Sequence, residues 1–71
     1  MTIEQKIGKF IKDYRVGSGM SQLELAVEMD AEQGSVCRWE NGKEMPRMEN
    51  LIKIADYFGL KLWAFFKELD V

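Results

Sequence analysis

Apolar residues recur every three or four positions along most of the chain, and nowhere do they alternate with polar residues as they would in a half-buried strand. This pattern predicts helices rather than strands. Capping residues, glycines and one proline divide it into five segments. We expect helices after Thr2, at about residues 22–29 and 33–40, after Pro46, and at about residues 62–69. The prediction is an all-α fold, a small orthogonal bundle of five helices in a single domain over residues 1–71.

The start of the second helix is the best marked in the chain. Ser21 is placed as N-cap, and Glu24 follows three residues later to complete a capping box. Met20 and Leu25 flank this pair at the spacing of a hydrophobic staple. Thr2 and Gln5 repeat the capping-box spacing at the start of the first helix. Over residues 21–46 the pattern predicts two short amphipathic helices joined by a turn of three or four residues, a helix-turn-helix at about residues 21–40.

The ordered residues of this region resemble the Cro/cI-type (lambda-repressor-like, XRE) helix-turn-helix family of DNA-binding regulators. The likeness covers most of the chain and implies a five-helix lambda-repressor-like fold that binds double-stranded DNA. The residues that carry it are SQ-x-x-LA at 21–26, Val36 and Arg38, WENG-x-x-x-P at 39–46 and L-x-x-IA-x-x-FGL at 51–60.

In this motif the second helix enters the major groove and reads base edges with its outward side chains. Periodicity turns Val36 and Trp39 inward, and Trp39 is expected to be a core plate rather than a base-stacking residue. Arg38 can pair bidentately with guanine and Gln33 with adenine. Arg38 in isolation also fits a solvated charge paired with Glu24 or Glu28, and Gln33 fits an exposed helix start equally well. The candidate base-reading residues are Gln33, Gly34, Ser35, Cys37 and Arg38.

Relatives also anchor the DNA backbone from the start of the first motif helix and from the loop after the second. The resemblance assigns phosphate binding to Gln22, Asn41, Lys43 and Arg47. Asn41 with Gly42 also fits a plain turn, and the two roles are compatible. The resemblance further implies an ion pair between Arg15 and Glu40 that ties the first helix to the end of the third.

Three features depart from a typical operator-binding chain. The 12 acidic and 10 basic residues leave a net charge of −2, although DNA binding depends on cations that displace counterions. Asp30 occupies a turn position where relatives place glycine, and we expect a left-handed backbone there. Glu32 replaces the N-cap serine usual before the third helix, and Gly34 stands where relatives often carry a base-reading side chain. The acidity favours an alternative, a protein-interaction module of antitoxin-like or anti-repressor-like type on the same fold.

Composition argues against other classes of protein. The chain has no His and a single Cys37, so it offers no Cys–His nucleophile, and we identify no cofactor or metal site. It also has no glycine-rich phosphate loop, and an enzyme is not expected. No apolar run approaches 18 residues and the first residues carry charges, so we expect a cytoplasmic protein with neither membrane span nor signal peptide.

The last segment carries more large apolar residues than one buried stripe requires. A chain of 71 residues buries only about 60% of its unfolded surface, so a partner subunit would add apolar contact. Our hypothesis is that Trp63 and Leu69 form a two-fold homodimer interface, whereas at least two of Leu62, Phe65 and Phe66 complete the core. The expected function is a dimeric transcriptional repressor that inserts the helix at about Gln33–Glu40 into the major groove, with a further protein partner as an open alternative.

Overall fold

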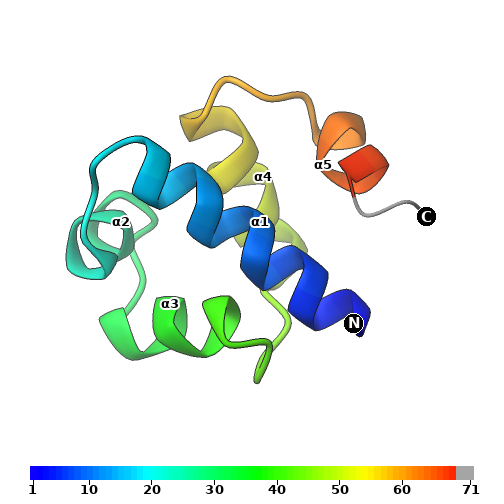
Figure 1. Ribbon diagram of the computed structural model, residues 1–71. Coiled ribbons are helices and arrows are strands. Elements are labelled where there is room, and N and C mark those ends of the chain that lie inside the picture. Colours follow the sequence, from blue (N-terminus) through cyan, green and yellow to red (C-terminus); the bar gives the residue numbers. More distant parts are fainter. Residues whose placement is uncertain (69–71) are drawn as a thin grey trace.

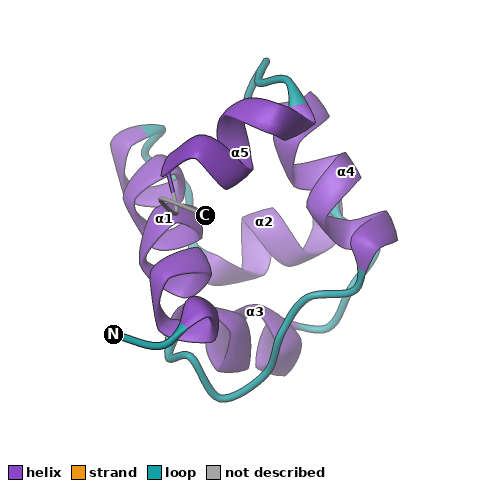
Figure 2. Cartoon of the chain, turned by 90° about the vertical axis from the view of Figure 1, so that its right-hand side faces the viewer, coloured by secondary structure: helices purple, strands orange, loops and turns teal. Residues whose placement is uncertain are grey.

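The computed structural model describes the backbone of residues 1–68 and the side chains of all of these except 64, 65 and 68. These residues form α1 (Ile3–Gly17), α2 (Gln22–Glu28), α3 (Gln33–Glu40), α4 (Met48–Tyr57) and α5 (Leu62–Glu68), and they contain no strand. The predicted all-helical class is confirmed. In Figure 1, α1 crosses the middle of the bundle, α3 lies below it and α2 stands at one side. Figure 2 shows the helices from the side, with α5 above α2 and α3.

The two predicted capping boxes are both present. Thr2 Oγ1 accepts the Gln5 N–H at 3.1 Å, and Gln5 Oε1 accepts the Thr2 N–H at 2.8 Å. Ser21 and Glu24 exchange the same pair of bonds at 3.0 and 2.9 Å. A helix as short as α2, with seven residues, gains little from its own hydrogen bonds. Its stability therefore depends on this cap and on burial.

The core collects the inward residues of α1 to α4. Trp39 is the largest of these side chains and is only 2% exposed, as expected for a core plate. α3 packs against both α1 and α2. At Gly8 a Cβ atom would lie 2.1 Å from the Trp39 carbonyl oxygen, so the backbones of α1 and α3 approach at a point that only glycine permits. The buried apolar residues are Ile7, Ile11, Leu25, Ala26, Met29, Val36, Trp39, Leu51, Ile54 and Ala55.

Residues with a left-handed backbone follow α2 and α4 at the positions that the sequence indicated. Asp30 has φ 53° in the turn between α2 and α3, which confirms the expected backbone. The N–H of Ala31 reaches the carbonyl of Ala26 at 2.9 Å and closes this turn. Gly59, at φ 72°, ends α4 in the same conformation. The turn at Asp30 gives α2 and α3 the orientation of a helix-turn-helix.

α5 packs against α4, and its residues divide between the core and the surface. Leu62 and Phe66 are partly buried against the core cluster, whereas Trp63 is 62% exposed. Leu69 and the side chain of Phe65 lie outside the described residues, so the contributions expected of them stay predictions. No helix in the described part of the chain is long and apolar enough to cross a membrane.

Candidate nucleic-acid interface

A buried polar network fixes α3 to the rest of the motif. The Glu40 side chain, at the end of α3, is 2% exposed and accepts Arg15 Nε at 2.5 Å and Nη2 at 2.9 Å. Arg15 Nη1 also donates to the Met20 carbonyl at 2.7 Å, which ties α1 to the residue before the α2 cap. The hydrogen bonds that the Arg15 guanidinium donates to Glu40 hold the pKa of Arg15 above its usual value. The ion pair that the resemblance implied is therefore present, and it sets the position of α3.

The residues of α3 divide between the core and the solvent as their helical spacing predicts. Val36 and Trp39 are buried, while Gln33, Gly34 and Arg38 are exposed. Ser35 and Cys37 are half-buried at the edges of this face. The candidate base-reading residues thus lie along the solvent side of one helix, with Gly34 and Arg38 on the side opposite the core.

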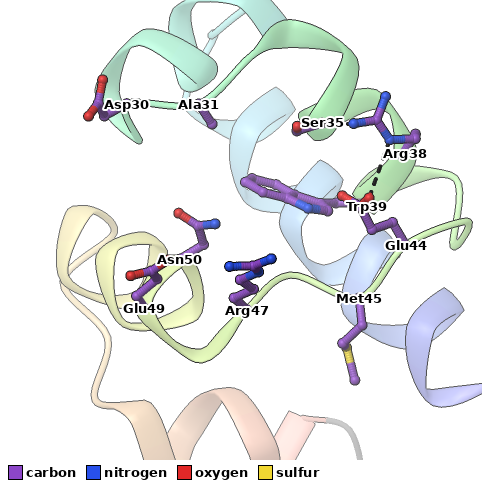
Figure 3. Close-up of a pocket in the computed structure, with 10 residues that line it drawn as sticks. All are labelled: Asp30, Ala31, Ser35, Arg38, Trp39, Glu44, Met45, Arg47, Glu49 and Asn50. Atoms are coloured by element: carbon purple, nitrogen blue, oxygen red, sulfur yellow. Dashed lines mark hydrogen bonds and ion pairs between the residues drawn. The ribbon is translucent and has the colours of Figure 1, made fainter.

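Arg38 is held by partners that sequence reasoning missed. Its Nη2 donates to Ser35 Oγ at 3.2 Å, and its Nε lies 3.5 Å from Glu44 Oε1 (Figure 3). Both side chains of the ion pair are about half exposed, at 50% and 45%. The partner is thus Glu44 in the loop after α3, and not Glu24 or Glu28 as the alternative interpretation proposed. The helical spacing of α3 could not predict this ion pair, because Glu44 lies in the loop after the helix and the loop brings it back beside Arg38.

A groove of about 430 Å³ lies between α3 and the start of α4. Figure 3 shows Arg47 and Asn50 extending from the α4 side toward Trp39 and α3. The groove combines cationic and anionic groups, since Arg38 and Arg47 share it with acidic side chains. Its lining consists of Asp30, Ala31, Ser35, Arg38, Trp39, Glu44, Met45, Arg47, Glu49 and Asn50. The structure therefore brings two predicted base-reading residues, Ser35 and Arg38, and one predicted phosphate anchor, Arg47, to the same concave surface.

The four predicted phosphate anchors differ in their surroundings. Lys43 and Arg47 are exposed. Arg47 is the N-cap residue of α4, and its side chain makes no capping hydrogen bond among the described residues. Asn41 is exposed and its Nδ2 donates to Cys37 Sγ at 3.3 Å. Gln22 is half-buried, and its Nε2 donates to the Glu40 carboxylate at 3.1 Å. Gln22 thus belongs to the network of Glu40 as well, a contact between residues 18 positions apart that the motif spacing did not show.

The described residues include no group of three acidic or cysteine side chains arranged to hold a metal ion. What the arrangement offers is a surface: one helix with hydrogen-bond donors outward, cations at its flank and helix starts on either side. Such a surface suits contact with a long anionic partner.

The fold and this surface define the class of the protein. A family model described as Helix-turn-helix matches residues 11–62, and the chain belongs to this lambda-repressor-like family of DNA-binding regulators. The match spans the motif helices together with residues 11–17 of α1 and all of α4.

Known proteins of related sequence or fold resemble this chain. The endothelial differentiation-related factor 1 homolog of Xenopus laevis is 35% identical over 57 residues, which are 80% of this chain and 39% of that protein. The chain thus spans about two fifths of the length of this relative. Two crystal structures of the clp gene regulator ClgR from Corynebacterium glutamicum match with TM-scores of 0.88 and 0.85 at 18% identity. They cover 99% of this chain and 74% and 91% of the ClgR chains, and at this identity they show the shared fold alone.

Proposed function

We propose that the chain is a sequence-specific regulator of transcription that inserts α3 into the major groove of double-stranded DNA. The observation that carries this proposal is the outward face of α3, where Arg38 stands above a buried Val36 and Trp39 and beside Arg47 in one groove. Arginine has the fork geometry that matches guanine O6 and N7. Lys43 and Arg47 lie at the flank of this helix in the places that phosphate anchors occupy.

The test is fluorescence anisotropy with the duplex upstream of the gene and with a scrambled duplex, each at two salt concentrations. Wild type is expected to prefer the upstream duplex and to weaken with salt, because bound cations displace counterions. Arg38→Ala is expected to lose about 5- to 150-fold of the preference, the range of one bidentate base contact. Lys61→Ala, which removes a cation between α4 and α5, is the control that should keep the preference. If the Arg38→Ala variant kept the same preference for the upstream duplex as wild type, Arg38 would not be a base reader.

We further propose that the regulator acts as a dimeric repressor at its own or a neighbouring promoter. Supporting this, Trp63 is 62% exposed on α5, with Lys67 Nζ 5.8 Å from the ring centroid. A two-fold pair through Trp63 and Leu69 would place two copies of α3 about 34 Å apart, one turn of DNA. Trp63→Glu is expected to halve the solution mass in light scattering at micromolar concentration. An unchanged mass would exclude this face as the dimer interface.

A second candidate function is a protein-interaction module of antitoxin-like or anti-repressor-like type on the same fold. It is favoured by the outer face of α2, where Leu23 and Val27 are 55% and 69% exposed beside Glu24 and Glu28. The net charge of −2 points the same way. Failure of wild type to bind either duplex at low salt would support this function and make a partner pull-down the next experiment.

A further inference from the structure

The guanidinium of Arg38 contacts Ser35 and Glu44 on two sides and lies over Gly34 on a third. Ser35 Oγ accepts Nη2 at 3.2 Å, and Glu44 Oε1 lies 3.5 Å from Nε. On the third side, a Cβ atom built at Gly34 would lie 3.2 Å from Nη1, which is closer than ordinary van der Waals contact. The side chain therefore folds back along α3 toward its N-terminal turn, over the position where Gly34 has no side chain.

This arrangement places the two terminal nitrogens of Arg38 over the first turn of α3. That turn is the part of a recognition helix whose side chains meet base edges. Recognition of guanine by arginine requires two parallel hydrogen bonds from a planar fork, so the orientation of the fork matters as much as its charge. A long side chain that is already oriented loses less conformational entropy on binding.

We propose that Glu44 and Gly34 are positioning residues for base reading by Arg38: Glu44 orients the guanidinium through Nε, and Gly34 leaves the space in which it lies. The inference rests on the proposed function, because it concerns how the same helix discriminates between sequences. It gives Gly34 a role that does not require a side chain of its own. It also gives the acidic loop residue Glu44 a role in a surface that binds an anion.

The two effects of Glu44 on DNA binding have opposite signs and can be separated. Its negative charge lowers affinity for every duplex, because it offsets one of the nearby cations. Its contact with Nε raises the ratio of specific to non-specific affinity. Glu44→Gln is therefore expected to bind a scrambled duplex more tightly and yet to discriminate less.

The experiment uses the tightest duplex that wild type selects from a library of randomised duplexes, and a scrambled duplex as reference. Glu44→Gln is expected to lower the ratio of the two affinities by up to about fivefold, the limit set by an exposed ion pair. Glu28→Gln is the matched control, since it removes one exposed carboxylate from α2 without touching Arg38, and it should leave the ratio unchanged. Arg38→Ala measures the whole contribution of the arginine.

Gly34→Ala supplies a second, independent readout. Alanine favours a helix over glycine, so the variant is expected to unfold at a higher temperature. The added Cβ must displace the guanidinium by a few tenths of an ångström, so the affinity ratio is expected to fall about twofold or more. A purely structural role of Gly34 would not produce higher stability together with poorer discrimination.

The outcomes separate this inference from the function on which it rests. If wild type selects no sequence, the proposed function fails and the inference with it. If wild type selects a sequence that Arg38→Ala no longer prefers, the function stands. In that case, equal ratios for wild type, Glu44→Gln, Glu28→Gln and Gly34→Ala would overturn the inference alone.

Discussion

Replacing Arg15 with Met removes the charged partner of a carboxylate that lies almost wholly inside the protein. Glu40 would lose the bonds from Nε at 2.5 Å and Nη2 at 2.9 Å and keep the one from Gln22 at 3.1 Å. Its side chain is 2% exposed, so water cannot replace the lost donors. Removing one member of a buried pair costs about 3–5 kcal/mol, because the remaining charge is left uncompensated.

This cost is large for so small a domain. At roughly 0.05–0.15 kcal/mol per residue, a chain of 71 residues has a free energy of unfolding of about 4–11 kcal/mol. Arg15→Met is therefore expected to remove a third or more of the stability. The assay is urea unfolding followed by circular dichroism, with the free energy taken from the linear extrapolation and the slope checked for constancy.

The pair between Lys9 and Asp13 provides the control. The distance from Lys9 Nζ to Asp13 Oδ2 is 2.8 Å, between the 2.5 and 2.9 Å of the two bonds from Arg15 to Glu40, but the side chains of this pair are 63% and 62% exposed. Lys9→Met is expected to cost no more than about 0.5 kcal/mol, because solvent screens the charges and remains available to both. If the two variants lost the same free energy of unfolding within error, the argument from burial would be wrong.

Two further predictions concern stability. Gly8→Ala is expected to destabilise the fold by about 1–3 kcal/mol, because its Cβ would lie 2.1 Å from the Trp39 carbonyl oxygen. Gly17→Ala should be neutral or slightly stabilising, since a Cβ at Gly17 would have no atom of the described residues within 4 Å. Thermal unfolding of the two variants measures the difference in stability. Hydrogen bonds with the backbone and side chain of Ser21 hold the pKa of Glu24 below its usual value. The ionised carboxylate of Glu24 therefore stabilises the fold at any pH above the pKa that it has in the unfolded chain. This stabilisation is lost as the pH falls through the lower pKa that Glu24 has in the folded protein. Wild type should therefore lose more stability than Glu24→Gln between pH 7 and pH 3, and parallel curves for the two proteins would contradict the cap's contribution.

The helices and their boundaries could be predicted from sequence because their signals are local. A capping box joins residues three apart, so Ser21 and Glu24 specify their own contact wherever the helix lies. The burial of Val36 and Trp39 likewise follows from spacing along one helix, whereas the left-handed turn at Asp30 was implied by the glycine that relatives place there. The resemblance added the ion pair between Arg15 and Glu40, which local spacing alone does not indicate.

The partners of the exposed long side chains could not be predicted in this way. The alternative interpretation of Arg38 as a solvated charge paired it with Glu24 or Glu28, but its structural partner is Glu44. Gln22 was assigned outward to phosphate, yet its amide nitrogen donates inward to Glu40.

The sequence by itself therefore determined the class of fold, the helix starts and turns, and which face of α3 looks outward, since each depends on contacts within one or two helical turns. The tertiary structure alone decided which polar groups meet across that surface. Glu44 reaches Arg38 because the loop after α3 folds back along the helix, and Glu40 meets Gln22 because α2 packs across the end of α3. Long side chains have many rotamers of similar energy, and only the packed neighbours that surround them select one.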